Sequence, residues 1–409
     1  MKLHLTGPSD KHLNETITIT GSKSESNRSL LLAALYPAIG IENISNSDDA
    51  QVMEKGLKIV NGTVDIHHAG TAMRFLTGYF ASQEGKEVVL TGSKRMTERP
   101  IKILVDALKS LGAEISYVQD EGYPPIKIKG HRIVKNKVSL PANVSSQYIS
   151  SLLLIAPSLE NGLELELVGK ITSIPYIKMT LGLLEQIGVQ TSFEGNLIKV
   201  SPKTNVEPTK LVVESDWSSA SYFYSICALS DPGTEITLSA YKKESLQGDS
   251  VLAKIYTSFG VETTYGENII TLKKTDKKID AKNEFDLANA PDIAQTIAVT
   301  CFGLGVGCHL IGLHTLKIKE TDRLEALHTE LSKLGASISV TDKTLTLTPS
   351  KKIIADVAID TYNDHRMAMS FAPLAMRTTL FVNDAEVVSK SYPDFWNDLE
   401  QLHFDIREL

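Results

Sequence analysis

The chain repeats one pattern of apolar and polar positions. An amphipathic helical segment ends in an apolar residue and a glycine, and a short strand with alternating apolar residues follows. Clear copies span residues 104–117, 181–193, 252–265 and 327–340, and weaker copies span 52–66 and 395–406, where His403 occupies the glycine position. A glycine there can take the left-handed conformation that ends a helix. The pattern predicts six related modules in which helices and strands alternate.

Three of these modules precede Asp216 and three follow it. We therefore expect a mixed α/β protein, of the α+β mixed kind, with two similar domains of three modules each. One domain should comprise residues 21–214. The other should comprise residues 1–20 together with 215–409, and it includes the first strand. A substrate cleft is expected between the two domains.

Composition limits the classes of partner. The chain has 409 residues, of which 22% are charged, and its formal net charge is -7. An acidic chain of this kind is a poor candidate for a nucleic-acid surface. Apolar runs fall short of the roughly 20 residues that span a bilayer, and the first residues lack the apolar core of a signal peptide. We expect a cytoplasmic protein that binds neither nucleic acid nor membrane.

The cysteines indicate no metal site. Cys227, Cys301 and Cys308 sit among apolar residues or glycine, without a CxxC pair or a His/Cys cluster at metal-ligand spacing. Buried, reduced thiols are the expected interpretation.

Short cationic segments embedded in small polar residues are scattered along the chain. They are residues 21–28, 69–74, 95–100, 319–323 and 363–366. Charge dispersed in this way indicates one site assembled by folding rather than a solvated tail. Lysine and arginine beside serine, threonine and glycine suit small anions, because the cations supply charge and the N–H and hydroxyl groups supply directional donors. We expect an enzyme that holds small phosphate and carboxylate compounds.

Each segment also has an ordinary structural interpretation. The turn at residues 21–23 precedes a helix in which Ser24 and Arg28 would lie one turn apart, and there we favour an anion site over solvated charges. At residues 145–147, taken alone, hydroxyl groups that cap the following helix are favoured.

Arg99 leaves two alternatives, because it can bind a ligand or pair with Glu98 or Asp106. Pro100 is expected to be the first residue of the next helix. Asp364 is expected to cap the apolar helix that follows it.

Lys319 and Arg323 are expected to lie one helical turn apart, with Glu320 beside them. A carboxylate among cations can be a salt-bridged scaffold or a proton carrier. The charge pattern alone favours the scaffold.

Seven ordered motifs together resemble the enolpyruvyl transferase family over essentially the whole chain. They begin at Gly21, Ala69, Arg95, Ser145, Asp216, Lys319 and Asn363, and they read GSKS, AGTAMR, RMTERP, SSQ, DWSSASY, KETDR and NDHRMAM. The resemblance implies two domains, each of three βαβαββ-type repeats in an inside-out, barrel-like fold. It also implies transfer of the carboxyvinyl group of phosphoenolpyruvate to the 5-hydroxyl of shikimate 3-phosphate. The route would pass through a tetrahedral intermediate on a monomer, without metal or organic cofactor.

The site residues that the resemblance implies fall on both predicted domains. For shikimate 3-phosphate they are Lys23, Ser24, Arg28, Ser145, Ser146, Gln147, Ser173, Asp292 and Lys319. For phosphoenolpyruvate they are Lys23, Gly70, Arg95, Gln147, Arg323, Arg366 and Lys390. Asp292 would accept the hydroxyl proton, Glu320 would protonate the methylene carbon, and Lys23 would contact both substrates.

Three positions depart from the family pattern. His68 stands where many relatives have asparagine, Thr315 where some have asparagine, and Phe75 where proline is common. Gly70 with Ala72 resembles the glyphosate-sensitive pattern, so glyphosate is expected to compete with phosphoenolpyruvate.

Two other functions stay open. A sister enzyme of the same fold acts on UDP-N-acetylglucosamine and usually carries a cysteine in the loop that matches the Arg95 region, whereas residues 93–97 contain none. A non-catalytic protein that binds phosphate ligands is the second alternative. The presence of both Asp292 and Glu320 argues against an inactive relative, and turnover of substrate would separate the classes.

Overall fold

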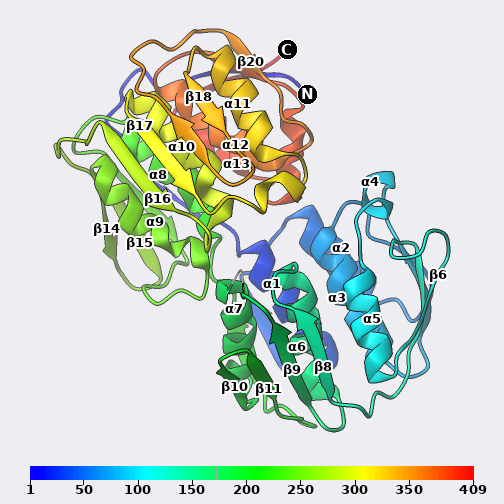
Figure 1. Cartoon of the computed structure of the whole chain (residues 1–409). Coiled ribbons are helices and arrows are strands. Elements are labelled where there is room, and N and C mark those ends of the chain that lie inside the picture. The colour runs from blue at the N-terminus through cyan, green and yellow to red at the C-terminus, as the bar shows by residue number, and fades with distance from the viewer. Residues whose placement is uncertain (172–173) are drawn as a thin grey trace. The chain divides into compact units, whose positions relative to one another are not determined.

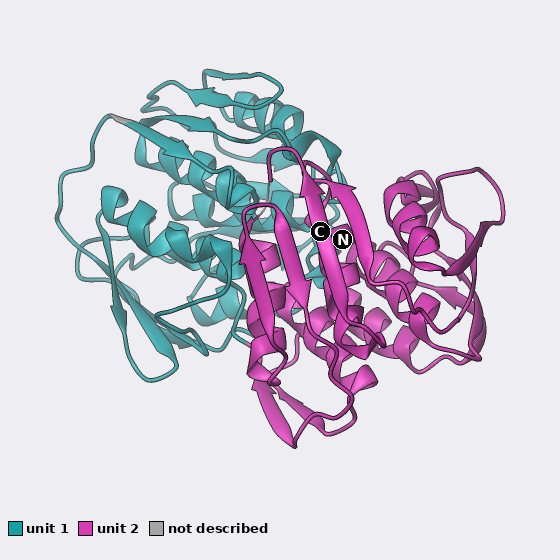
Figure 2. Cartoon of the chain, turned by 60° about the horizontal axis from the view of Figure 1, so that its bottom comes forward, with its two compact units in different colours: residues 1–20, 214–409 teal, residues 21–213 magenta. Residues whose placement is uncertain are grey.

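The computed structural model describes residues 1–171 and 174–409 (Figure 1). The chain forms two compact units, which Figure 2 colours separately. Unit 1 comprises Met1–Thr20 and Glu214–Leu409, and unit 2 comprises Gly21–Val213. Unit 2 is therefore one continuous segment that interrupts the sequence of unit 1.

Unit 2 contains helices that alternate with short strands. Its helices are α1 (Lys23–Leu35), α2 (Asp48–Leu57), α3 (Gly70–Ser82), α4 (Lys94–Thr97), α5 (Lys102–Leu111), α6 (Ser146–Ile155) and α7 (Ile174–Gln186), with the 3-10 helix η1 (Ala156–Ser158). Its strands are β3 (Ile39–Glu42), β4 (Asn61–Asp65), β5 (Glu87–Thr91), β6 (Glu114–Tyr117), β7 (Ile126–Lys129), β8 (Lys137–Pro141), β9 (Leu163–Val168), β10 (Thr191–Glu194), β11 (Leu197–Val200) and β12 (Thr209–Val212).

Unit 1 alternates in the same way and adds several 3-10 helices. Its α-helices are α8 (Trp217–Leu229), α9 (Leu252–Ile255), α10 (Ala294–Leu304), α11 (Arg323–Lys333), α12 (His365–Phe371) and α13 (Phe395–Gln401). Its 3-10 helices are η2 (Gly248–Val251), η3 (Tyr256–Phe259), η4 (Pro291–Ile293), η5 (Leu316–Ile318), η6 (Ala372–Met376) and η7 (Ala385–Lys390). Its strands are β1 (Leu3–Thr6), β2 (Asn14–Ile17), β13 (Glu235–Ser239), β14 (Val261–Tyr265), β15 (Ile269–Lys274), β16 (Lys282–Asp286), β17 (Gly307–Ile311), β18 (Ile338–Val340), β19 (Leu345–Leu347), β20 (Val357–Ile359), β21 (Leu380–Val382) and β22 (Asp405–Glu408).

Each four-stranded sheet joins one parallel pair to antiparallel neighbours. In unit 1 the orders are β14-β15-β13-β2, β16-β17-β19-β18 and β20-β21-β1-β22; in unit 2 they are β4-β5-β7-β6 and β10-β11-β9-β8, with the parallel pair β12-β3 besides. Strand β1 lies between β21 and β22, with Leu3 opposite Val382 and Glu408. The predicted pairing of the first strand with the second half of the chain, and the mixed α/β class, are therefore confirmed.

Helices, rather than sheets, occupy the centre of each unit. All residues of α8 are buried, and so are all residues of α3 except Ser82. The strands alternate, as in β7 with the pattern buried, exposed, buried, exposed. A helix apolar on all sides belongs in a core, whereas an alternating strand covers a core with one face only. The inside-out arrangement that the resemblance implied follows from these burial patterns.

The predicted helix endings are confirmed where the glycine signal was clear. Gly112 has φ +111, and the N–H of Ala113 bonds to Leu108 O at 2.9 Å, which is the hydrogen bond of a left-handed C-cap. His403 takes the same role with φ +64, although a Cβ crowds this conformation. The copy at residues 52–66 differs, because α2 ends at Leu57 and Gly62, with φ +109, lies inside β4.

Two further features concern the helices. Helix α5 begins at Lys102 with Ile101 as its N-cap, so the expectation that Pro100 starts the helix is wrong. Among the described residues, no helix combines the length and apolar character needed to cross a membrane. Cys227, Cys301 and Cys308 are buried and unbridged, which agrees with the expectation for their packing.

Candidate active site

Most predicted site residues share one place in the fold, the start of a helix. In unit 2, Lys23, Gly70 and Ser146 are the first residues of α1, α3 and α6. The starts of α3 and α6 are joined, since Gln147 Nε2 donates to Thr71 Oγ1 at 3.1 Å. Helix N-termini present free N–H groups and a positive dipole end, so this assembly suits anions.

The start of α1 exposes only its first two side chains. Lys23 and Ser24 are half-buried, whereas residues 25–32 are all buried. The ammonium group of Lys23 lies 3.4 Å from the buried carboxylate of Asp49, which holds it at the surface of the unit. Lys23 and Ser24 are thus the side chains of this helix start that face outward.

Arg28 lies behind that surface. Its guanidinium donates to Thr180 Oγ1 at 2.8 Å, to Ser150 Oγ at 2.9 Å and to the Ser24 carbonyl at 2.7 Å, so it ties α1 to α6 and α7. Burial lowers its pKa to about 10, which leaves it charged at neutral pH. Phe75, which departs from the family pattern, places its ring 5.3 Å from this guanidinium.

Ser145 confirms the capping interpretation of its segment. It is the N-cap of α6, and its hydroxyl accepts from the N–H of Gln147 at 3.4 Å. Ser173, the remaining predicted phosphate ligand of unit 2, lies outside the described residues.

Two arginines lie near the start of α3. Arg95 is exposed and pairs with Glu98 at 3.2 Å, while Asp106 pairs with Lys102. The structure thus gives other partners to both carboxylates considered for Arg99. The guanidinium of Arg99 instead lies against Gly70, where a Cβ atom would stand 2.8 Å from its Nη1. A methyl group at Gly70 would therefore oblige the end of the Arg99 side chain to shift.

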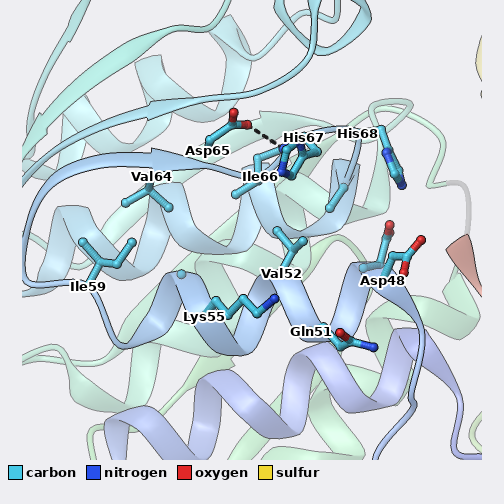
Figure 3. Close-up of a pocket in the computed structure, with 13 residues that line it drawn as sticks. Asp48, Gln51, Val52, Lys55, Ile59, Val64, Asp65, Ile66, His67 and His68 are labelled. Carbon is cyan, nitrogen blue, oxygen red and sulfur yellow. Dashed lines mark hydrogen bonds between the residues drawn. The ribbon is translucent and has the colours of Figure 1, made fainter.

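A pocket of about 380 Å³ lies in unit 2 between α2 and the segment before α3 (Figure 3). Asp49 and His68 both line it. His67 has φ +48, and its N–H bonds to Asp65 Oδ1 at 2.8 Å, which fixes the turn that carries the two histidines. His68, the second departure from the family pattern, therefore shares a pocket with the carboxylate that holds Lys23.

In unit 1, Asp292 gathers three cations. Arg323 Nη1 lies 2.8 Å from its Oδ1, Lys319 Nζ lies 3.4 Å from the same oxygen, and Arg366 Nη2 lies 3.3 Å from Oδ2. Asp292 is in η4, Arg323 begins α11 and Arg366 is in the first turn of α12, so helix starts again converge. Burial alone would raise the pKa of Asp292, but Arg366, Lys319 and Arg323 together lower it well below its ordinary value.

Arg323 is the centre of this cluster. Its Nε donates to Asp364 Oδ2 at 2.7 Å and its Nη2 donates to Glu320 Oε2 at 2.8 Å, and the residue is only 1% exposed. Asp364 also accepts from the N–H of Arg366 at 2.9 Å, which confirms the predicted cap. Glu320 completes a ring of three carboxylates around Arg323, and this ion pair is compatible with both the scaffold and the proton carrier.

The expected helical turn between Lys319 and Arg323 is wrong. Helix α11 begins at Arg323 after its N-cap Asp322, and Lys319 is extended, with φ -80 and ψ -150. The aspartate cap starts the helix at Arg323, about one turn too late to include Lys319. Lys319 and Arg323 still meet, because both reach Asp292.

Lys390 completes the predicted set. It ends η7 and donates to the carbonyl of Asn363 at 2.7 Å, directly beside the Asp364 cap. Thr315, the third departure from the family pattern, is the N-cap residue of η5.

In each unit, a residue beside the predicted site residues was missed in the sequence. Asp49 holds Lys23, and Asp249 accepts a hydrogen bond from Ser218, whose hydroxyl accepts from Arg366 Nη2 at 3.2 Å. Asp249 lies in η2, far in sequence from every cationic segment, and only the fold brings it to the cluster. A buried carboxylate needs a partner, but the sequence does not show where the partner lies.

Known proteins are similar to this chain over its whole length. A family model described as EPSP synthase (3-phosphoshikimate 1-carboxyvinyltransferase) matches residues 38–399. The chain is 45% identical over 412 residues to the 3-phosphoshikimate 1-carboxyvinyltransferase of Bacteroides fragilis, covering 100% of this chain and 99% of that protein. It is 36% identical over 422 residues to the protein of the same name from Haemophilus influenzae, covering 95% and 96%.

The fold has a solved counterpart as well. The EPSP synthase structure from Acinetobacter baumannii superposes with a TM-score of 0.83 at 21% identity, and the match covers 100% of both chains. At this identity the likeness concerns the fold, and it includes the elements that carry both groups of polar residues.

Proposed function

The chain belongs to the EPSP synthase family, and we propose that the polar residues at the helix starts of its two units bind and activate the two substrates of that family. The enzyme is a transferase that moves the carboxyvinyl group of phosphoenolpyruvate to the 5-hydroxyl of shikimate 3-phosphate, with release of phosphate. The observation that carries the proposed roles is the convergence of Lys319, Arg323 and Arg366 on Asp292.

Unit 2 would supply donors for the phosphate of shikimate 3-phosphate. Lys23 and Ser24 face outward at the start of α1, and Ser145, Ser146 and Gln147 surround the start of α6. Hydroxyl groups and free helix N–H groups bind a phosphate directionally, and the lysine adds charge. Arg28 lies below this surface and would act through the electrostatic field of its positive charge. The proposed phosphate-binding role of Ser173 rests on the resemblance alone.

The cations of the unit 1 cluster would offset the negative charge of the substrates. The two substrates together carry about five to six negative charges at neutral pH, since each phosphate carries about 1.5 to 2 and each substrate also has one carboxylate. An arriving anion would compete with Asp292 for the N–H donors of Arg366 and Lys319. When these cations turn to the substrate, Asp292 loses neighbours that lower its pKa, and it becomes a stronger base for the hydroxyl proton.

The proposed chemistry has two steps. In the addition, the C5 oxygen of shikimate 3-phosphate bonds to C2 of phosphoenolpyruvate, Asp292 takes the hydroxyl proton, and Glu320 gives a proton to the methylene carbon. In the elimination, the Glu320 carboxylate takes a proton back from the new methyl group and the C2–O bond to phosphate breaks, which restores the double bond. Arginine and lysine side chains would stabilise the departing phosphate.

Arg366→Gln tests the proposed binding role. Loss of a charged hydrogen bond costs about 1.5–3 kcal/mol, so the KM for phosphoenolpyruvate should rise about 10- to 100-fold. The assay is phosphate release at saturating shikimate 3-phosphate, with UDP-N-acetylglucosamine as an acceptor that should support none. Arg377→Gln is the matched control, because Arg377 is exposed at the end of η6 in the same unit. An unchanged KM in Arg366→Gln would remove this residue from the site.

Gly70→Ala tests the placement of phosphoenolpyruvate and glyphosate beside α3. A methyl group at Gly70 would meet Arg99 Nη1 at 2.8 Å and displace it. Because the displaced group is the charged end of a flexible side chain, the methyl group should act through the changed position of this cation, and competitive inhibition by glyphosate should weaken by about tenfold, the effect of about 1.4 kcal/mol. Gly40→Ala in β3 is the control, since open space surrounds its position. Unchanged inhibition in Gly70→Ala would contradict the placement.

A further inference from the structure

A second layer of polar groups lies behind Arg366. Asp249 is buried in η2, and its carboxyl accepts a hydrogen bond from the Ser218 hydroxyl at the start of α8. The same hydroxyl oxygen lies 3.2 Å from Arg366 Nη2. Because arginine can only donate, Ser218 must accept from Arg366 and give its single proton to Asp249. The three groups therefore form a directed chain from the cation cluster to a buried carboxyl group.

We propose that Asp249 is a positioning residue that acts through Ser218 on Arg366 and couples the binding of an anion there to the uptake of one proton. The anion is the phosphate or carboxylate of phosphoenolpyruvate, so this inference rests on the proposed function of Arg366.

The charges around Asp249 explain why it would take up a proton. Ser218 faces it from the start of α8, and the charged groups that act on it are Asp216, the N-cap of α8, Asp292 in η4 and Arg366 in α12. Asp249 is itself the one ionisable residue of η2. With Lys319 and Arg323, Arg366 makes three cations in the cluster. Three carboxylates already balance their charge, those of Asp292, Glu320 and Asp364. A further ionised carboxylate would leave an excess of negative charge in a buried place.

The acidity of Asp249 agrees with this balance. Burial, and then the negative charge of Asp292, raise its pKa to about 7, although Arg366 and Ser218 oppose the rise. A phosphate or carboxylate that binds Arg366 adds negative charge and raises this pKa further. Protonated Asp249 thus favours the anion, while ionised Asp249 competes with it for Arg366. Affinity for phosphoenolpyruvate should therefore fall as the pH rises through about 7.

Asp249→Asn is the direct test. Asparagine keeps an oxygen that can accept from Ser218 but cannot ionise, so it mimics the protonated carboxyl at every pH. The ratio of wild-type KM to variant KM for phosphoenolpyruvate should be near 1 at about pH 6 and should rise about 3- to 10-fold by about pH 8.5, since one unit of pKa shift is a tenfold change in affinity. Phosphoenolpyruvate ionises equally in both assays, so the effect of its own ionisation cancels in the ratio. The pH profile of kcat should be the same in the variant as in the wild type.

A matched control comes from another buried carboxyl of unit 1. Burial raises the pKa of Asp398 to about 6, and its carboxyl accepts from Tyr392 and Gln401. Asp398→Asn should leave the pH dependence of KM as in the wild type. Infrared difference spectra provide a second readout, in which a protonated carboxyl band should titrate near pH 7 in the wild type, disappear in Asp249→Asn and grow when phosphoenolpyruvate binds.

The outcomes separate this inference from the proposed function. A flat KM ratio together with a KM increase in Arg366→Gln would overturn the coupling and keep the binding role of Arg366. No effect of Arg366→Gln would overturn the binding role and the coupling with it. A band that titrates near pH 7 but does not respond to phosphoenolpyruvate would also overturn the coupling.

Discussion

Glu320→Gln should slow phosphate release about 100- to 10,000-fold at saturating substrates, because this is the contribution of a positioned proton carrier. Glu320 Oε2 accepts from Arg323 Nη2 at 2.8 Å, and a glutamine oxygen can accept the same bond. The variant thus removes the proton while it preserves the contact. In heavy water, the wild type should also exchange deuterium into the methylene group of phosphoenolpyruvate, and the variant should lose this exchange.

The control for this experiment lies in the first turn of α11. Glu325 is exposed and pairs with His328 at 3.6 Å, so Glu325→Gln changes the same functional group close to the site in sequence. It should keep the wild-type rate. A Glu320→Gln variant that also kept the wild-type rate and exchange would place the proton carrier on another residue, and Glu320 would then be a scaffold only.

Arg323→Met should lower the free energy of unfolding of unit 1 by about 3–5 kcal/mol, the usual cost when one partner of a buried ion pair is removed. The substitution leaves the carboxylates of Asp292, Glu320 and Asp364 without their shared cation. Both tryptophans of the chain, Trp217 and Trp396, belong to unit 1, so tryptophan fluorescence in urea follows this unit selectively.

The same experiment has a surface control and a pH dependence. Arg407→Met removes an exposed pair with Asp405 and should change the urea midpoint little. Because cations hold the pKa of Asp292 well below its ordinary value, its ionised form adds stability above about pH 4, and this stability is lost as the pH falls through the lowered pKa. The difference between wild type and Arg323→Met should therefore shrink in acid, and a constant difference would contradict the role of Asp292 as partner.

The sequence predicts local turns of this fold better than its long-range order. Gly112 and Gly335 mark helix ends because a left-handed residue is a property of the local backbone, and both take positive φ. Strand order is not local. The position of β1 between β21 and β22 joins residues at opposite ends of the chain, and a strand signal alone does not select that partner.

In the site, too, the sequence predicts local features better than long-range contacts. Asp364 is recognisable as a cap from its place before an apolar run, but its bond to Arg323 depends on a helix that begins 41 residues earlier. Arg28 reads as a ligand-binding residue from its motif, yet Thr180 and Ser150 hold it below the surface. Charge and spacing therefore identify the segments that supply the site, while burial decides which side chains face outward.

The interrupted sequence of unit 1 has a consequence for synthesis on the ribosome. Unit 2 is continuous, so all of its contacts are available once residue 213 has emerged. Strand β1, made first, must wait for β21 and for β22, whose Glu408 lies opposite Leu3. Contacts between the two ends of a chain form slowly, and an unpaired strand edge invites wrong partners in the meantime. We therefore expect unit 2 to fold before unit 1, and the synthesis of β22 to decide when the sheet that contains β1 can become complete.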